Sequence, residues 1–550
     1  MLNARFLAVL FAACMLSLGI APAWAQKTAV RYGVFEESML SSKQYANPLK
    51  DVQVTVTVTD PRGNRKEVEA FWDGFSVWKF RYMPRMVGPH TFTVKCSDPS
   101  NAGLNAPGDR FTAVEYRGEN ELAKRGPLVL SANRRYFQHA DGTPFFLVSD
   151  TAWNGALLSD DEEWERYLKE RKAQKFNTIQ FVTTQWRAAY ADNDGQTAFS
   201  GVDEVAVNPS FFQRMDKRVS TLNEQGFVGL PVVLWALTGP KRESPGEVLP
   251  REQAALLARY IVARYDAFNV LWFLGGDGDY RGDKAERWKY LGREVFPAVR
   301  KTNLVSLHPR GQQDPWPGLK DEPWLDFLNY QTGHGSSAKK WNWNATQGTA
   351  SGWKLEPPRP VFDSEPNYEN HTSYGENKVI DAYDVRRASW YSVLIAPPAG
   401  ITYGTHGVWP WMKEIGVPLN HANSGSAMPW FASLDNPGAE SIKAMAEIMS
   451  NMPWTTFEPY QALIVAPPLK EDFSNFIPCA RTISREKALC YVPAKTTPAL
   501  NTYSFESGVR ATWIDPRTGI RKTPIDLIRI NRVDVNTPSE EDWLLLLERK

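Results

Sequence analysis

The chain has 550 residues, of which 43% are hydrophobic and 23% charged, so it can bury a substantial core. Its 37 glycines and 39 prolines are close to average usage, which excludes collagen-like and low-complexity classes. Lys and Arg total 63 against 62 Asp and Glu, and this net charge of +1 argues against nucleic acid or anionic lipid as the main partner.

The first 25 residues predict an export signal. Arg5 supplies the positive charge, residues 6–21 are apolar, and residues 23–25 form an A-x-A-type cleavage site. A lipoprotein acylated at Cys14 is the alternative. No later segment is apolar enough to span a bilayer. We therefore expect a periplasmic or secreted protein, cleaved after Ala25 and without a membrane span.

Residues 29–117 have the pattern of a small β-sandwich. Residues 52–58 alternate strictly between apolar and polar side chains, residues 60–63 form a turn, and residues 77–82 and 90–95 alternate again. Short alternating strands separated by close turns are typical of a sandwich. No catalytic groups cluster in this region, so we expect it to support the next domain by packing against it.

Residues 127–455 alternate between strand-like runs and amphipathic helices. The runs have near-continuous apolar cores, as parallel strands covered on both sides should. They lie at residues 145–150, 178–184, 229–235, 269–277, 304–308, 327–332, 360–365 and 400–403. Eight such runs predict an α/β fold, a (β/α)8 TIM barrel. An open doubly wound sheet is the alternative, but no Gly-rich phosphate loop follows the first run.

Residues 456–550 return to a β pattern and predict a second sandwich. Strands are expected at residues 462–465, 488–492, 509–514 and 543–547. Cys479 and Cys490 flank a polar stretch between two strand-like runs, so a cross-strand disulfide and two separate buried thiols both remain open.

The active site of such a barrel lies at the C-terminal ends of its strands, so the end of each run holds the candidate residues. Polar and aromatic side chains converge there, although any single member also has a structural explanation. The candidate substrate-binding residues are Asp150, Trp153, Gln185, Trp186, Trp235, His308, His334, Tyr368, Tyr403 and His406.

Two carboxylates at this rim are the catalytic candidates. Asp277 follows two glycines at the end of the fourth run, and Glu365 ends the seventh. Glycoside cleavage needs one carboxyl group to protonate the leaving oxygen and another to act as nucleophile or base. Asp363 should share a strand face with Glu365 and is a competing candidate. Asp279 and Glu369 lie on the following loops and are further candidates for substrate binding.

Other chemistries have weaker support. Histidines lie at or just after the ends of the fifth, sixth and eighth runs, but they have no metal-binding spacing, and no His-Glu-x-x-His helix is present. No Gly-x-Ser-x-Gly elbow favours a serine nucleophile. The sequence therefore predicts neither a metal nor another cofactor.

Several motifs in order resemble the apiosidase-like glycoside hydrolases, which are family 140 and its DUF4038 relatives. The motifs are Asp150-Thr-Ala-Trp153, residues 176–180, 272–277 and 308–311, Asp363-Ser-Glu-Pro-Asn-Tyr368, and residues 402–409. The resemblance covers the whole barrel. Residues 29–117 resemble the DUF5060 sandwich, and residues 513–519 resemble the C-terminal domain labelled collagen-binding in these proteins.

The resemblance implies a retaining mechanism with Asp277 as acid/base and Glu365 as nucleophile. Most retaining (β/α)8 glycosidases carry Asn-Glu on the fourth strand, whereas this chain has Gly276-Asp277, which counts against an ordinary cellulase or mannanase. The family's activity implies release of terminal apiose, a branched furanose, from pectic polysaccharide.

The sequence is therefore compatible with three functions. The first is a monomeric, exported, apiosidase-like hydrolase acting on a polysaccharide or oligosaccharide. The second is a furanosidase or endo-glycanase of other specificity on the same barrel. The third is a non-catalytic glycan-binding or adhesion protein, which would have no need of both Asp277 and Glu365.

Overall fold

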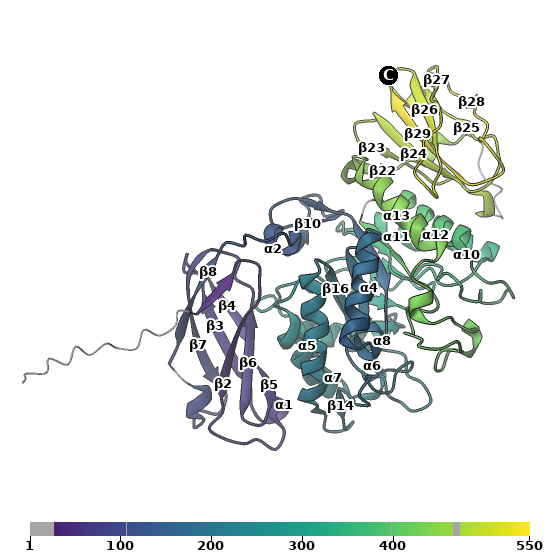
Figure 1. Ribbon diagram of the computed structural model, residues 1–550. Helices are drawn as coiled ribbons and strands as arrows, with labels where there is room; N and C mark the ends of the chain where they lie inside the picture. The colour runs from purple at the N-terminus through teal and green to yellow at the C-terminus, as the bar shows by residue number, and fades with distance from the viewer. Residues whose placement is uncertain (1–26, 106, 398, 466–472) are drawn as a thin grey trace, which may run out of the picture.

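The computed structural model describes residues 27–105, 107–397, 399–465 and 473–550, so the predicted export signal and Cys14 lie outside the described residues. A central barrel has one β domain beside it and another at one end (Figure 1). In the part of the chain that is described, no helix has the length and apolar character needed to cross a membrane.

The N-terminal β domain consists of two sheets facing each other. The first has the order β1 (Thr28–Val30), β8 (Asp109–Val114), β7 (Gly88–Cys96), β3 (Val54–Thr59), β4 (Arg65–Glu69), and the second β2 (Phe35–Leu40), β6 (Val77–Tyr82), β5 (Phe71–Gly74). In β3 the valines Val54, Val56 and Val58 are buried while the threonines between them are more exposed, because successive side chains point to opposite faces. This alternation confirms the predicted sandwich.

The central domain is an eight-stranded parallel barrel, which confirms the predicted fold. Its strands follow the order β18 (Val305–Pro309), β17 (Trp272–Gly278), β16 (Val228–Trp235), β13 (Thr178–Val182), β12 (Leu147–Thr151), β21 (Gly400–Tyr403), β20 (Val361–Asp363), β19 (Leu328–Tyr330). The main surrounding helices are α4 (Asp161–Ala173), α5 (Pro209–Glu224), α7 (Arg251–Tyr265), α8 (Lys284–Val295), α10 (Ala338–Thr346), α11 (Thr349–Lys354), α12 (Ala382–Ile395) and α13 (Pro437–Ser450). Each of the eight apolar runs overlaps one of these strands.

The barrel closes between β18 and β19 through side chains. Asn329 donates from Nδ2 to the carbonyl of Leu307 at 2.6 Å, and the Ser306 hydroxyl donates to the carbonyl of Phe327 at 2.7 Å. The connection between these strands carries only the short helix α9 (Trp316–Leu319). Polar side chains therefore replace part of the backbone ladder at this position.

A small sheet made of β9 (Leu128–Leu130), β10 (Phe137–His139) and β11 (Pro144–Phe145) packs at the N-terminal end of the barrel. The ring of Phe137 lies 5.5 Å from that of Phe327 and 6.3 Å from that of Phe362, beside the starts of β19 and β20. This end of the barrel is therefore filled by aromatic rings.

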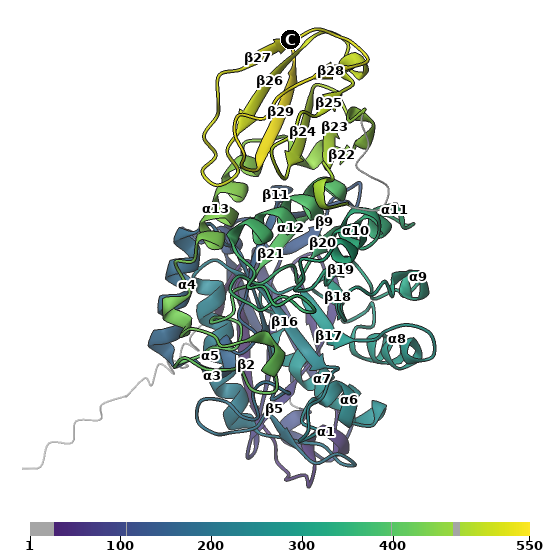
Figure 2. The ribbon, with the colours of Figure 1, turned by 90° about the vertical axis from the view of Figure 1, so that its right-hand side faces the viewer.

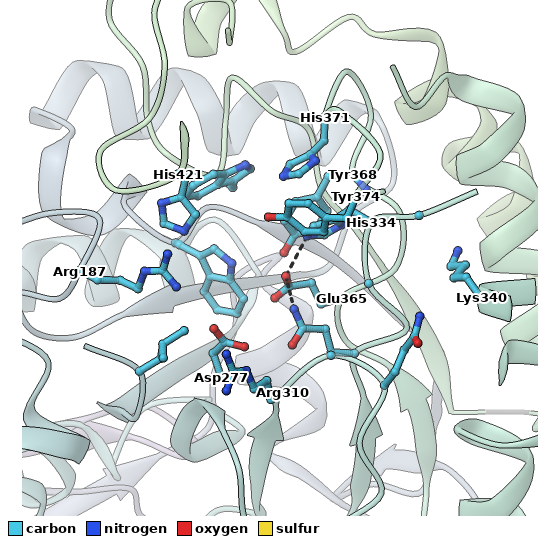
Figure 3. A pocket seen from close by; sticks show the side chains of 18 of the residues that line it. Arg187, Asp277, Arg310, His334, Lys340, Glu365, Tyr368, His371, Tyr374 and His421 are labelled. Atoms are coloured by element: carbon cyan, nitrogen blue, oxygen red, sulfur yellow. Dashed lines mark hydrogen bonds and ion pairs between the residues drawn. The ribbon is translucent and has the colours of Figure 1, made fainter. Parts of the chain in front are cut away.

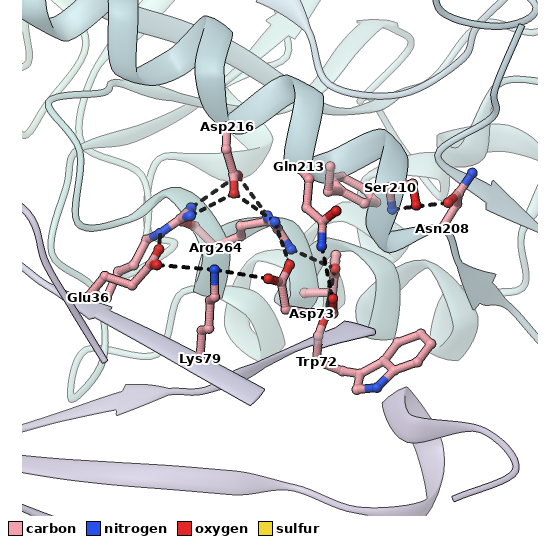
Figure 4. Close-up of polar contacts among 12 residues, drawn as sticks. Glu36, Trp72, Asp73, Lys79, Asn208, Ser210, Gln213, Asp216 and Arg264 are labelled. Atoms are coloured by element: carbon pink, nitrogen blue, oxygen red, sulfur yellow. Dashed lines mark hydrogen bonds and ion pairs between the residues drawn. The ribbon is translucent and has the colours of Figure 1, made fainter. Parts of the chain in front are cut away.

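The N-terminal sandwich packs on helices α5 and α7 through buried charges (Figure 4). Arg264 of α7 bonds Asp73 of β5 at 2.8 Å and Asp216 of α5 at 2.7 Å. Arg81 of β6 bonds the same Asp216 at 2.7 Å. Because each arginine shares a carboxylate with the other domain, the sandwich and the barrel form one packed unit.

The C-terminal domain sits on α12 and α13 (Figure 2). Its main sheet has the order β22 (Phe457–Pro459), β23 (Cys479–Thr482), β24 (Lys487–Val492), β29 (Trp543–Arg549), β26 (Val509–Ile514), β27 (Ile525–Leu527), with β25 (Ala499–Leu500) and β28 (Val533–Asp534) forming a second. Tyr491 and Leu544 on one face of the main sheet join the barrel core, while Leu545 on the other face joins a separate core. Arg386 of α12 pairs with the buried Asp542 at 2.8 Å.

Two expectations about this domain have clear outcomes. Cys479 and Cys490 lie opposite each other on β23 and β24 and are joined in a disulfide. The strand expected at residues 462–465 is wrong, because Gln461–Leu463 forms a short 3-10 helix instead. Only Leu463 of that helix is buried, and a single helical turn is enough to direct this side chain into the core.

Candidate active site

A cavity of about 400 Å³ opens at the C-terminal ends of the barrel strands (Figure 3). Its walls combine indole and phenol rings with charged groups. The aromatic members are Trp153, Trp186, Trp235, Tyr368, Tyr374 and Trp409, and the two carboxylates are Asp277 and Glu365. A concave aromatic site with a few convergent polar groups is typical of ligand binding.

The backbone at the end of β17 is shaped to place Asp277. A Cβ added to Gly275 would lie 2.4 Å from the ring of Trp288, and one on Gly276 would lie 2.5 Å from the ring of Trp235. The glycines therefore let both indoles pack directly on the strand. Asp277 itself has a φ of 52°, which is unfavourable for a residue with a side chain and is typical of functional positions. The strand pairing with β18 is also irregular here, which redirects the side chain.

The charge state of Asp277 follows from its surroundings. Burial raises the pKa of this carboxyl to about 7, and the negative charge of Glu365 acts in the same direction, against the positive influence of His308, Arg187 and Arg310. No side chain donates a hydrogen bond to Asp277 within the described ranges. Asp277 can therefore carry a proton near neutral pH and give it up.

Glu365 lies two residues beyond the end of β20 and is held from three sides. Its Oε1 accepts hydrogen bonds from Gln331 Nε2 at 2.7 Å and His334 Nε2 at 3.0 Å, and its Oε2 lies 3.3 Å from His308 Nε2. Burial alone would raise the pKa of Glu365, but these two histidines outweigh it and hold the pKa well below its usual range. Glu365 is therefore ionised wherever the protein is folded near neutral pH.

The two carboxyl groups thus have pKa values pushed in opposite directions within one cavity. Such a separation distinguishes a proton donor from a nucleophile or base. Asp277 has the properties of the acid, and Glu365 has those of the ionised partner. This is the arrangement that glycoside cleavage requires.

The predicted binding residues fall into two groups. The cavity is lined by Trp153, Trp186, Trp235, His334 and Tyr368. His308 lies just behind this surface, where it supports Glu365 and packs edge-on against Trp153 at 5.3 Å between ring centres. The remaining candidates, Asp150, Gln185, Tyr403 and His406, do not line the cavity, and their partners explain why.

Asp150 and Gln185 are turned into the protein. Asp150 is fully buried, and its Oδ2 accepts from Arg171 Nε at 2.6 Å and from the Tyr167 hydroxyl at 2.7 Å. Gln185 donates to the carbonyl of Phe199 at 2.9 Å and so fastens a loop. Both side chains therefore have protein partners and lie outside the lining of the cavity.

Tyr403 and His406 are also taken up by protein partners. The Tyr403 hydroxyl donates to Glu369 Oε2 at 2.6 Å, which removes both side chains from the cavity. His406 Nε2 lies 2.9 Å from the hydroxyl of Ser424, behind the ring of His371.

The remaining two acidic candidates are likewise occupied. Asp363 is buried and accepts from the hydroxyls of Thr332 at 2.6 Å and Ser392 at 3.1 Å. Asp279 forms ion pairs with Arg281 and Lys284 on the outer loop.

Several cavity residues were missed by the sequence reasoning. They are Arg187, Arg310, Gln331, Lys340, His371, Tyr374, Trp409 and His421. Gln331 is the second-to-last residue of a predicted strand, and Arg310 follows His308 by two residues, so strand-end position could have found both. His371 and His421 lie on long loops, whose paths no local pattern indicates.

Within the described ranges, no group of three or more His, Cys, Asp or Glu side chains is placed to hold a metal ion.

Residues 131–456 match the family model of the apiosidase-like catalytic domain, and residues 28–97 match DUF5060, a domain of unknown function. The chain belongs to the apiosidase-like family. It is a glycoside hydrolase, as the sequence motifs predicted. No curated protein matches the chain.

Solved structures of glycoside hydrolases share the fold. One described as "Glycoside hydrolase" has a TM-score of 0.66 at 23% identity and covers 78% of this chain and 97% of its own. A family 5 glycoside hydrolase from Bacteroides vulgatus ATCC 8482 has a TM-score of 0.66 at 22% identity, with 77% and 93% covered. A candidate glycoside hydrolase from the same organism has a TM-score of 0.70 at 17% identity, with 95% and 100% covered.

Proposed function

We propose that this protein is an exported, retaining glycoside hydrolase that releases terminal furanosyl residues of the apiose type from pectic or related plant polysaccharide. The observation that carries the proposal is the pair of carboxyl groups in one aromatic cavity. The pKa of Asp277 is raised to about 7, while that of Glu365 is held well below its usual range. The substrate class rests on membership in the apiosidase-like family.

In the first step, Glu365 attacks the anomeric carbon while Asp277 gives its proton to the glycosidic oxygen. The bond between the anomeric carbon and that oxygen breaks, and the leaving group departs as an alcohol. In the second step, Asp277 takes a proton from water, whose oxygen attacks the same carbon and releases Glu365 as a carboxylate. The two inversions leave the anomeric configuration unchanged.

The supports around Glu365 suit a nucleophile. Gln331 and His334 both donate to Oε1, which fixes the plane of the carboxylate. Oε2 is left with His308 at 3.3 Å as its neighbour. A carboxylate held in one orientation loses less freedom on reaching the transition state.

The aromatic walls suit a sugar. C–H groups on a sugar face are attracted to the electron-rich face of an aromatic ring. Trp153 and Trp235 lie edge to face at 5.3 Å, and Trp186 lies 4.2 Å from Trp235 between ring centres, so they form one continuous surface. A volume of about 400 Å³ is within the range of small-ligand sites.

Export is supported by two independent features. The first 25 residues have the order of a cleavable signal, and the Cys479–Cys490 disulfide is typical of oxidising compartments. N-terminal sequencing of the mature protein tests cleavage after Ala25. Labelling with a fatty acid at Cys14 would instead identify a lipoprotein.

The decisive experiment is a screen of the purified protein against pectic glycans, with apiosides, arabinofuranosides and internal backbone fragments as separate substrates. Released sugars are identified, and NMR records the anomer formed first. We expect apiose with retained configuration and no product from the Glu365→Gln variant. Release of an inverted sugar would make Glu365 a general base. Arabinose as the product would place the enzyme among the other furanosidases, and no product from any glycan would favour the binding protein.

A further inference from the structure

A second cavity lies between the N-terminal sandwich and the barrel and has a volume of about 360 Å³. It is bounded by β4 and β6 of the sandwich, by α7, and by the segments that lead into β17 and β18. Those segments are at the N-terminal ends of the barrel strands, so this cavity is distant from the active site at the opposite end. We call it the interdomain cleft and define it by Arg65, Lys66, Arg85, Asp266, Arg300 and Lys301.

The interdomain cleft carries an excess of positive charge. Seven lysines and arginines line it, against three aspartates and glutamates. Four of the seven have carboxylate partners, but two of those, Arg259 and Arg300, share the single carboxylate of Glu69. The ion pairs within the cleft therefore do not balance its charge.

The other three cations are Arg65, Lys66 and Arg85, and none of them has an ion-pair partner in the described part of the chain. Lys66 donates from Nζ to the carbonyl of Lys301 at 2.8 Å, and Arg85 donates to the carbonyl of Thr302 at 3.1 Å. These two bonds hold two uncompensated cations at adjacent positions just before β18.

The surroundings of Lys66 disfavour the charged form of its ammonium group. Burial lowers its pKa, and although Asp266 acts against this, the charges of Arg85 and Lys301 lower the pKa further. An anion bound here would supply the ion-pair partner that Lys66 and Arg85 lack among the described residues. A cluster of cations that the fold holds together without enough carboxylate partners is a candidate binding site.

The remaining wall of the cleft is apolar. Val68, Tyr82 and Phe296 line it beside the cations. A ligand that fits therefore presents both negative groups and apolar faces. Sugar rings that carry carboxylates have both, because the carboxylates match guanidinium groups and the C–H faces match aromatic rings.

We propose that the interdomain cleft binds an acidic oligosaccharide, a short chain of uronate sugars, at a site separate from the catalytic cavity. The choice of a carbohydrate follows from membership in a glycosidase family. The proposal does not depend on the roles of Asp277 or Glu365. A second site of this kind holds the enzyme on an acidic polysaccharide while the active site works elsewhere on it.

The test measures binding of trigalacturonate to the full-length protein by calorimetry at physiological ionic strength. The double variant Lys66→Gln/Arg85→Gln removes two cations from the cleft. The control Arg62→Gln/Lys95→Gln removes the same two residue types from exposed positions of the same sandwich outside the cleft. Because hydrogen bonds to charged groups are strong, we expect the cleft variant to bind at least about tenfold more weakly and the control to bind as the wild type does.

Further arms separate the alternatives. Turnover of a small neutral glycoside should be unchanged in the cleft variant, since the active site is intact. Binding of trigalacturonate that is equal in the wild type and the cleft variant overturns the proposal, as does a cleft that binds inorganic phosphate but not trigalacturonate. If the double variant is unstable, Arg65→Gln replaces it, because the Arg65 side chain makes no hydrogen bond in the described ranges, and a loss of about threefold is expected.

Discussion

Two regions at the same end of the barrel surround their carboxylates with different partners. On β12, Asp150 is completely buried and one of its oxygens is shared by Arg171 and Tyr167. On β17 and after β20, Asp277 and Glu365 face the cavity, and no arginine or lysine is hydrogen-bonded to either in the described part of the chain. Position at a strand end is common to all three. The difference lies in what the neighbouring helix or loop supplies.

This difference separates a structural carboxylate from a reactive one. A buried carboxylate paired with an arginine is neutralised and fixes the helix that carries the arginine, here α4, to the barrel wall. A carboxylate supported only by histidines, an amide or nothing keeps its capacity to exchange a proton or attack a substrate.

The largest effect is expected for Glu365→Gln. The amide is nearly the same size but cannot act as a nucleophile, so kcat on every glycoside should fall by at least about 10³-fold. Steady-state kinetics on a glycoside with a good leaving group measure the loss, because such a substrate does not need the acid.

The control for that variant is Asp279→Asn, which changes an acidic residue two positions from Asp277 that is paired with Arg281 and Lys284. Its activity should be close to that of the wild type. Equal losses in both variants would mean that the Glu365 substitution acts by general damage to the rim of the barrel and would not support a nucleophilic role.

The next largest effect is expected for Asp277→Asn, which removes the acid. Substrates with poor leaving groups should lose about 10²- to 10⁴-fold in kcat/KM, whereas activated ones should be spared in the first step. Azide should then speed the second step of the activated substrates. If all substrates lose activity equally and azide has no effect, Asp277 is not the acid.

The same roles of Asp277 and Glu365 predict the direction in which the rate changes with pH. Activity needs Asp277 protonated and Glu365 ionised, so the rate should fall as the pH rises through about 7 and should persist well below the usual glutamate range. The alkaline fall should be absent in Asp277→Asn when an activated substrate is used. Rate–pH profiles of both proteins test this.

The raised pKa of Asp277 also makes the stability of the folded protein depend on pH. Its pKa is raised in the folded state, so the folded protein binds more protons than the unfolded chain between the ordinary value of 3.8 and about 7. Stability therefore falls as the pH rises through that range. Asp277→Asn should remove this fall and raise Tm at pH values above it, which thermal unfolding at several pH values measures.

The fold could be predicted from the sequence, and so could the position of Asp277 and Glu365 at strand ends beside one cavity, because both depend on local patterns. Parallel barrel strands are buried on two sides, so each appears as a continuous apolar run, and Asp277 and Glu365 follow directly from the strand ends. Asp363 shows where this stops. Strand β20 ends at Asp363, so the alternation that should place it on the face of Glu365 no longer holds, and Thr332 and Ser392 bind it inside the protein.

Other candidate residues lie outside the cavity because they bond partners that are distant in the sequence. Nothing near Asp150 indicates that Arg171 will reach it from α4, and nothing near Tyr403 indicates Glu369. Arg187 and His421 enter the cavity from loops, whose course is set by tertiary packing. The sequence therefore identifies a strand-end residue as a candidate, but it does not predict whether the side chain points into the cavity or into the protein.

The structural side of the contrast is tested by Asp150→Asn. Removing the charge leaves Arg171 buried without its partner, and breaking a buried pair in this way costs about 3–5 kcal/mol. We expect that loss in the free energy of unfolding in urea, with kcat/KM of the folded enzyme nearly unchanged. A variant that keeps its stability but loses activity would move Asp150 into the catalytic group.

The smallest effect is expected for Trp235→Phe, which tests whether the aromatic wall recognises sugar or only fills the core. Trp235 is 4% exposed and lines the cavity, and its Nε1–H has no partner in the described ranges. Phenylalanine offers a sugar a smaller aromatic face than the indole does, so the substitution should raise KM by about 5- to 10-fold with little change in kcat. Trp513 offers a matched control, because it is also 4% exposed with an unpartnered Nε1–H but lies in the C-terminal domain. Trp513→Phe should leave KM unchanged. If both variants lower Tm equally and neither changes KM, Trp235 belongs with Asp150 among the residues that build the barrel.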